Sequence, residues 1–224
     1  MSSFFKTYPS LETYFAKHGE DIAYEKGQHL VWRNDESLWV YLLRSGFVRA
    51  SFSFPDGTRR IIGFFVPGSV FAQSGSFFAD KDGMLSYSAE TPVTVLRVKR
   101  SHFLQSLDTG TDMAKDYLDL TLRNQIFLVD RLMYQGEAGI RKKFARWLLF
   151  MCKYYCLDAS NPGTIRIPLT QTTIADFLHI TRESANAVIK EFVDKEYIRV
   201  ESKVITIIDR DALKILVGEK RSSE

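Results

Sequence analysis

The chain has 224 residues, of which 45% are hydrophobic and 25% are charged, a composition typical of an ordered globular protein. The net charge of +3 at pH 7 is small, so a surface for nucleic acid would have to come from local clustering of Lys and Arg. Two cysteines are too few for a disulfide framework or a four-cysteine metal or iron–sulfur site. Residues 1–17 lack signal-peptide character and no apolar run is long enough to span a membrane, so we expect a cytoplasmic protein without membrane association.

Residues 22–98 are rich in aromatic and β-branched side chains and are interrupted by glycines, a pattern typical of short strands joined by tight turns. The clearest hairpin pairs residues 47–54 with residues 59–65. Its turn contains Asp56 and Gly57, and the glycine supplies the positive φ that a tight turn requires. This segment therefore predicts a β-roll or barrel.

Residues 111–135 predict one long helix with two apolar stripes, both of which must be buried. The second stripe is Leu118, Leu122, Val129 and Leu132. The first recurs at alternating steps of four and three and is Met113, Tyr117, Leu120, Asn124, Phe127 and Arg131. We expect one stripe to pack on the roll and the other on the same helix of a second subunit. We assign the first to the subunit interface, with Asn124 setting the register; a helix buried within one monomer is the alternative.

Glycines at 136 and 139 predict a hinge after this helix. A second helix is expected over residues 140–156, a short strand over 165–167 and a hairpin over 197–208 that turns near residues 201–203. The predicted organisation is a sensor domain over 1–110, a dimerisation helix over 111–136, a DNA-binding domain over 137–218 and a polar tail over 219–224.

The segment 169–192 carries the most informative motif. Thr170 and Thr181 are each placed to cap a short helix, and the small Ala175 lets the two helices cross closely. The outward face of the second helix would hold the polar residues that suit base edges and phosphates in a major groove: Arg182, Glu183, Asn186 and Lys190. An αα-hairpin that binds no nucleic acid is the alternative interpretation.

The same segment resembles the helix-turn-helix of Crp/Fnr transcription regulators. Residues 41–49 and 64–71 are similar to the glycine-marked strands of that family's cyclic-nucleotide-binding-type roll, and residues 143–149 to the helix that opens its DNA-binding domain. The resemblance spans about residues 20–210 in the right order. It implies an α+β fold with an N-terminal double-stranded β-helix (β-roll), a long dimerisation helix and a C-terminal winged helix-turn-helix.

The resemblance also implies roles for individual residues. Arg182 would contact guanine, Glu183 the amino group of cytosine, and Asn186 would supply a further base contact. The expected phosphate contacts are Gln171, Thr172, Thr181, Ser184 and Lys190. Ala187 stands where the family often has Arg, and His179 stands at a turn position often held by Gly, so His179 would have to adopt a left-handed conformation.

Several effectors are disfavoured for the sensor domain. Residues 83–90 contain no Arg or Lys to neutralise a buried cyclic phosphate, which argues against cyclic AMP. The cysteine count argues against an iron–sulfur cluster, and four isolated histidines argue against haem. No metal or cofactor is expected. A candidate effector pocket is formed by Phe64, Phe71, Gln73, Ser74 and Tyr87, although such a Phe-rich roll is more often only a core.

The predicted function is a homodimeric, sequence-specific regulator of transcription that binds an inverted repeat in double-stranded DNA, with RNA polymerase as a partner if it activates. A ligand-binding regulatory module is the first alternative. A cupin-like enzyme is the last, because no metal-ligand cluster or catalytic nucleophile is apparent and no catalytic residue is assigned. Cys152 and Cys156, one turn apart, are either packing residues or an oxidant-sensing thiol pair.

Overall fold

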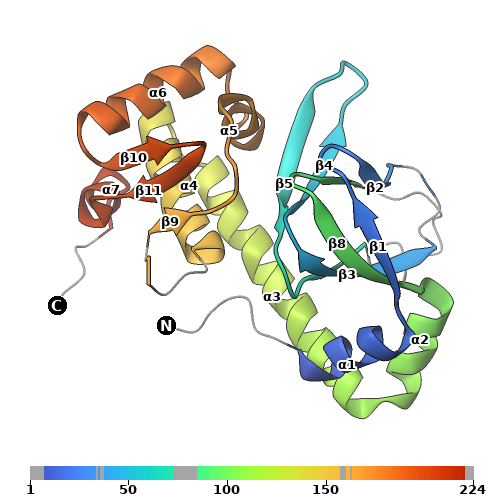
Figure 1. Cartoon of the computed structure of the whole chain (residues 1–224). Helices are drawn as coiled ribbons and strands as arrows, with labels where there is room; N and C mark the ends of the chain where they lie inside the picture. The colour runs from blue at the N-terminus through green and yellow to red at the C-terminus, as the bar shows by residue number, and fades with distance from the viewer. Residues whose placement is uncertain are drawn as a thin grey trace. The chain divides into compact units, whose positions relative to one another are not determined.

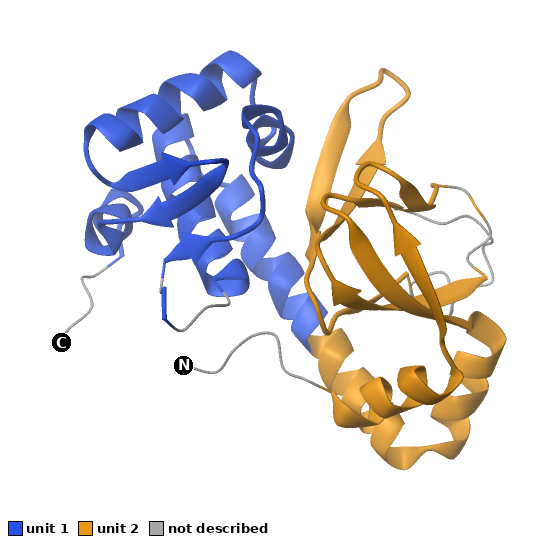
Figure 2. Ribbon diagram, in the orientation of Figure 1, with its two compact units in different colours: residues 1–4, 123–224 blue, residues 5–122 orange. Residues whose placement is uncertain are grey.

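The computed structural model describes residues 8–33, 35, 38–72, 85–156, 160–161 and 163–219. The chain forms two compact units, drawn in different colours in Figure 2. The N-terminal unit contains residues 5–122, and the C-terminal unit contains residues 123–224 together with residues 1–4. The division falls inside the long helix, which the sequence analysis had set apart as a segment of its own.

The N-terminal unit is built on two antiparallel four-stranded sheets, the arrangement expected for a β-roll (Figure 1). The first has the order β1 (Glu20–Tyr24), β8 (Val93–Lys99), β3 (Trp39–Ser45) and β6 (Val70–Phe71). The second has the order β2 (His29–Val31), β7 (Ser86–Ala89), β4 (Val48–Ser53) and β5 (Arg59–Phe65). Strands that are distant in sequence therefore pair throughout the roll.

The predicted β4–β5 hairpin is confirmed. Val48 pairs with Phe65 at one end and Ser53 with Arg59 at the other, with one register shift between them. Gly57 has a φ of +81°, and the carboxylate of Asp56 accepts a hydrogen bond of 2.8 Å from the amide of Thr58. The turn residues thus satisfy their own backbone, as a tight turn requires.

Aromatic side chains fill the space between the two sheets. Phe71 is 1% exposed, and its ring centroid lies 5.3 Å from that of Tyr41, 5.0 Å from that of Phe65 and 5.4 Å from that of Tyr87. Val48, Val93 and other aliphatic residues complete this core. Pairs of rings at this spacing stabilise a core beyond the area they bury.

Three helices close the other side of the first sheet. They are α1 (Pro9–His18), α2 (Arg100–Thr109) and the first half of α3 (Thr111–Gln135). Phe15 and Phe103, both fully buried, pack with Val98 of β8 in the core beneath them. The predicted long helix is confirmed with its bounds, whereas α1 and α2 were not predicted.

The C-terminal unit continues from α3 into a winged helix-turn-helix, as predicted. Its helices are α4 (Ile140–Tyr155), α5 (Gln171–Leu178), α6 (Arg182–Asp194) and α7 (Arg210–Leu216). An antiparallel sheet has the order β10 (Ile198–Glu201), β11 (Val204–Ile207) and β9 (Thr164–Ile165). The hairpin β10–β11 is the wing, and α7 was not predicted.

The core of the C-terminal unit is aromatic as well. Phe144 and Trp147 of α4 are fully buried, and they contact Phe192 of α6 and Phe177 of α5 with ring centroids 4.9 and 5.9 Å apart. Tyr134, at the end of α3, is also fully buried. One helix, α4, therefore holds both helices of the helix-turn-helix through stacked and edge-to-face rings.

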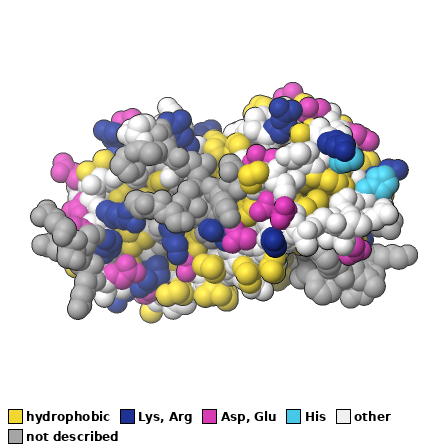
Figure 3. Space-filling model, turned by 90° about the horizontal axis from the view of Figure 1, so that it is seen from below, with side chains coloured by type: hydrophobic (Ala, Val, Ile, Leu, Met, Phe, Trp, Pro, Cys, Tyr) yellow, Lys and Arg dark blue, Asp and Glu magenta, His cyan; other side chains and the backbone are white. Residues whose placement is uncertain are grey.

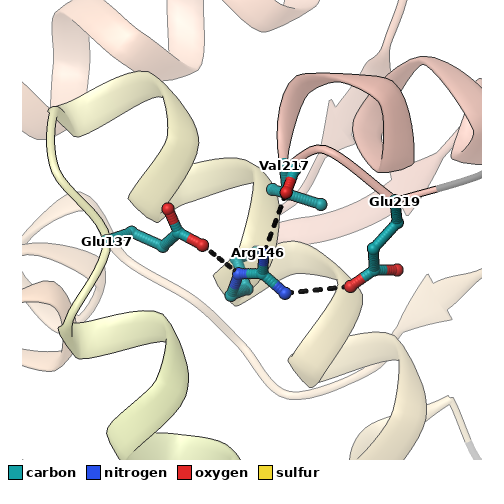
Figure 4. A network of polar contacts seen from close by, with 4 residues as sticks. All are labelled: Glu137, Arg146, Val217 and Glu219. Carbon is teal, nitrogen blue, oxygen red and sulfur yellow. Dashed lines mark hydrogen bonds and ion pairs between the residues drawn. The ribbon is translucent and has the colours of Figure 1, made fainter.

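The segment between α3 and α4 contains the predicted hinge glycines, and Gly139 has a φ of +84°. Arg146 of α4 ties this segment to the end of the unit (Figure 4). Its guanidinium pairs with Glu137, donates to the carbonyl of Val217 at 3.0 Å and contacts Glu219 at 2.9 Å. Because Glu137 is held in this way, the connection after α3 is fixed by an ion pair within the C-terminal unit.

A buried ion pair lies on the second sheet of the roll. Arg49 and Glu90 are 3.1 Å apart, their side chains are 16% and 8% exposed, and Arg49 also donates to the hydroxyl of Ser88 at 3.2 Å. Burial raises the pKa of Glu90, and the charge of Arg49 opposes that rise. The carboxylate therefore depends on this arginine.

We predict that Arg49→Met lowers the free energy of unfolding by about 3 kcal/mol at neutral pH, because it leaves Glu90 buried without its cation. The pKa of Glu90 in the folded state already lies above its unfolded value, so its protonated form favours folding and its contribution is lost as pH rises. The destabilisation should therefore be larger at pH ~8 than at pH ~5. Urea unfolding at both pH values measures this difference.

The matched control is Arg44→Met, which removes an exposed ion pair with Asp21 whose side chains are 55% and 62% exposed. Its cost should stay below about 1 kcal/mol. Equal losses in the two variants, or a loss in Arg49→Met that does not change with pH, would contradict the role of the buried pair.

Candidate nucleic-acid interface

The two helices of the motif begin at the predicted caps. The hydroxyl of Thr170 accepts a hydrogen bond of 3.0 Å from the amide of Thr173, and that of Thr181 accepts one of 3.1 Å from the amide of Ser184. Between them His179 adopts φ 58° and ψ 46°, the left-handed conformation expected at this turn. The turn between α5 and α6 is therefore defined by two caps and one strained residue.

Buried side chains fix how α6 is rotated. Ala185, Val188 and Phe192 are at most 3% exposed and face the interior of the unit. Arg182 and Glu183, in the first turn of α6, are consequently exposed, and so is Lys190 two turns later. The structure thus presents two charged side chains at the start of a capped helix, where recognition helices contact base edges.

Asn186 lies differently from the expectation. Its side chain is half-buried, and its carbonyl oxygen Oδ1 is buried without a hydrogen-bond partner among the described residues. The neighbouring Ala187 is exposed instead. The reason is helical geometry, because Asn186 follows directly on Ala185 and its side chain is turned partly toward the core. This placement disagrees with the outward-facing base contact inferred from sequence.

The residues expected at phosphates divide into two groups. Gln171 and Thr172, in the first turn of α5, and Thr181 are exposed. Ser184 is half-buried, and its hydroxyl oxygen accepts a hydrogen bond of 3.1 Å from Thr181. Its hydroxyl proton remains available as a donor, so Ser184 is compatible with a phosphate contact but is already part of the cap.

The wing adds a cation that the sequence analysis missed. Ser202 and Lys203 form the β10–β11 turn with φ values of 48° and 69°, and Lys203 is exposed. The carbonyl of Lys203 accepts a hydrogen bond of 2.9 Å from the amide of Leu169, directly before the cap of α5. The wing tip therefore lies beside the first turn of α5. A Lys in the turn of a predicted hairpin was the only signal in the sequence.

Ion pairs neutralise the other end of α6. Glu191 contacts Arg141 of α4 and Lys195 of α6, each at 2.7 Å. These cations lower the pKa of Glu191, with Lys195 making the larger contribution. They thereby hold the second half of α6 against α4, while the exposed charges at its first turn take no part in this cluster.

The first stripe of α3, which was expected at the subunit interface, is covered by the chain itself. Met113 and Leu120 are 7% and 8% exposed in the core of the N-terminal unit, with Tyr117 packed against them. Arg131 is 5% exposed and lies 4.7 Å from the ring centroid of Phe177. The half-buried Phe127 contacts Phe150 and Tyr154, and Asn124 is half-buried.

The second stripe of α3 is exposed instead. Apolar side chains between 47% and 66% exposed follow this face: Leu118, Leu122, Ile126, Leu128, Val129, Leu132 and Met133. Figure 3 shows one face of the molecule, on which hydrophobic side chains reach the surface between charged ones. The structure thus exchanges the roles that sequence reasoning had given to the two stripes.

The candidate effector residues do not form one site. Phe71 and Tyr87 belong to the aromatic core of the roll. Phe64 is paired with Arg49, one position from the pair Val48–Phe65 that faces this core, so Phe64 faces the opposite side of the sheet. Gln73 and Ser74 lie outside the described residues. The described part of the chain supports the interpretation of these aromatic residues as core.

Two further observations concern the described residues. Within them, no group of three or more His, Cys, Asp or Glu side chains is arranged to hold a metal ion. None of the described helices combines the length and the apolar character needed to cross a membrane.

Together these features define a two-unit protein with a cyclic-nucleotide-binding-type roll and a winged helix-turn-helix. Comparison with known families agrees: residues 21–109 match the cyclic nucleotide-binding domain, and residues 142–216 match the Crp-like helix-turn-helix domain. The two matches cover most of the chain in the order seen in the structure. The chain belongs to the Crp/Fnr family of transcription regulators.

Individual relatives are distant but cover nearly the whole chain. The transcriptional activatory protein AadR of Rhodopseudomonas palustris is 25% identical over 206 residues, which are 90% of this chain and 80% of AadR. The structure of FixK2 from Bradyrhizobium japonicum superposes with a TM-score of 0.75 at 21% identity, covering 92% of this chain and 99% of FixK2. A CooA variant from Carboxydothermus hydrogenoformans gives 0.78 at 15% identity, covering 95% and 96%.

Proposed function

We propose that this regulator reads its operator with the first turn of α6 in the major groove. The capped helix with Arg182 and Glu183 exposed at its start is the observation that carries this proposal. Arg182 would donate two hydrogen bonds to guanine O6 and N7, and Glu183 would accept one from the amino group of cytosine. Lys190, Gln171, Thr172, Thr181 and Ser184 would contact phosphates, and Lys203 of the wing would join them.

The regulator acts as a homodimer through the exposed stripe of α3. Leu118, Leu122, Gln125, Val129 and Leu132 recur at alternating steps of four and three and are all exposed. This heptad spacing is the seam of a two-stranded coiled coil, so the partner that covers it is the same helix of a second copy. Gln125, the single polar residue of the seam, replaces Asn124 as the residue that would set the register.

The β-roll modulates this activity, and cyclic AMP is not the effector. Tyr87 and Ala89 of β7 belong to the core of the roll, and residues 83–90 contain no Arg or Lys. Arg49 contacts Ser88 on the opposite face of the sheet, where it is already paired with Glu90. A cyclic phosphate inside the roll would lack a compensating cation from this strand.

The protein acts by binding and not by catalysis, and a regulator of this kind works where the chromosome is, in the cytoplasm. Two helices α6 related by a dimer axis would contact successive major grooves of an inverted repeat. If the bound dimer activates transcription, RNA polymerase is its second macromolecular partner. Iron–sulfur and haem cofactors are not part of the proposal.

Arg182→Ala should cost about 1–3 kcal/mol on the best operator and relax the preference at one base pair of each half-site. Lys190→Ala should weaken all sequences alike and reduce the salt slope by about one unit per phosphate contact. Binding-site selection followed by titration at several salt concentrations measures both effects. Footprinting should show two half-sites about 34 Å apart.

Asn186→Ala is the matched control on the same helix. Because the carbonyl of Asn186 is buried, we expect this variant to keep the sequence preference. Equal losses on operator and random DNA for Arg182→Ala and Lys190→Ala would reduce the segment to a nonspecific basic surface and contradict the proposed readout.

Val129→Glu should weaken the dimer by about 3 kcal/mol, roughly a hundredfold in the dimer dissociation constant, because each subunit loses one buried apolar side chain. Leu120→Glu should instead unfold the N-terminal unit, since Leu120 lies in its core. Sedimentation velocity and thermal unfolding separate the two outcomes.

Ile215→Glu is the control, because Ile215 is an apolar residue of α7 with 51% exposure away from the seam. It should leave both the dimer and the fold intact. A fully dimeric Val129→Glu variant would move the interface away from the exposed stripe.

Cyclic AMP should not bind with micromolar or tighter affinity, because the described interior of the roll is filled by aromatic rings and the strand that would face the phosphate carries no cation. Calorimetry with the full-length dimer tests this directly. Saturable binding of one cyclic AMP per subunit would show that the effector site includes residues outside those described.

A further inference from the structure

The only two cysteines of the chain lie together at the end of α4. Cys152 is in the last turn of this helix and Cys156 is its C-terminal cap, so the two are one turn apart on one side. Cys152 is 8% exposed and Cys156 is half-buried. Their side chains are hydrogen bonded to each other, which places the two sulfur atoms in direct contact.

Two donors surround this thiol pair. The backbone N–H of Gly163, next to β9, donates to the sulfur of Cys156. The guanidinium of Arg210, the first residue of α7, interacts electrostatically with both sulfur atoms. A dithiolate formed here would therefore be next to a positive charge and a hydrogen-bond donor, which favours an anionic centre.

A disulfide fits this position poorly. Side chains four residues apart on a helix have Cβ atoms about 5–6 Å apart. A disulfide requires a Cβ–Cβ distance of roughly 3.5–4.5 Å, so the last turn of α4 would have to unwind. An ion bound between the sulfur atoms adds two metal–sulfur bonds of roughly 2.3 Å each, the length typical of metal thiolates, and spans the gap without unwinding.

We infer that Cys152 and Cys156 form a two-coordinate binding site for a soft monovalent cation, with Cu(I) as the best match. Thiolates select such ions, and two thiolates satisfy a coordination number of two. On binding, each thiol releases one proton to solvent and the two sulfur atoms each donate one electron pair to the metal. The product carries one net negative charge, which Arg210 compensates. This inference is independent of the proposed DNA readout.

Anaerobic titration of the reduced full-length protein with Cu(I), in competition with a coloured Cu(I) chelator such as bicinchoninate, tests the site. We expect the wild-type protein to take one copper ion per chain from the chelator. Cys152→Ser and Cys156→Ser should each abolish this uptake while keeping the thermal unfolding profile, and ultraviolet absorption should show a thiolate-to-copper band only in the wild type.

Arg210→Gln should weaken Cu(I) binding by about tenfold, as is usual for a residue next to a metal site. Lys214→Gln is the matched control, because it removes an equal charge from the same helix at a residue that pairs with Asp211. Failure of the wild-type protein to compete for copper, equal uptake by the double Cys→Ser variant, or formation of a disulfide in air by a protein that takes up no copper would each overturn the inference.

Discussion

The rest of the structure depends on one helix that carries apolar side chains on more than one face. The first half of α3 packs with α1 and α2 in the N-terminal unit, and its second half packs with α4 and α5 in the C-terminal unit. Apolar residues of a third face stay exposed along the same helix. Because such a row is costly in water, α3 is both a core element of each unit and the natural seam for a second subunit.

Aromatic packing explains how the C-terminal unit keeps its recognition helix in place. Rings from α4 contact rings on α5 and α6, and Arg131 of α3 lies over Phe177 of α5. Burial lowers the pKa of Arg131, and a buried guanidinium among aromatic rings is stabilised by cation–π attraction. The end of α3 is therefore bound to the helix-turn-helix by directional contacts, in addition to nonspecific apolar burial.

The same physical chemistry argues against an open effector cavity in the part of the roll that the structure describes. The rings around Phe71 are in contact with one another, and the charged pair of Arg49 and Glu90 lies on the opposite face of its sheet. A signal can act on a packed roll by changing which side chains fill it, so modulation does not require a preformed void.

Local sequence patterns determined the elements with short-range causes. The caps Thr170 and Thr181, the Asp56-Gly57 turn and the two-stripe periodicity of α3 each depend on neighbouring residues, and each was confirmed. The short helices α1, α2 and α7 were missed, because their stability comes from packing against distant elements and not from their own periodicity. Only the tertiary structure decided which stripe of α3 is covered, that Asn186 is turned inward and that Lys203 lies beside α5, since each depends on contacts between segments far apart in the chain.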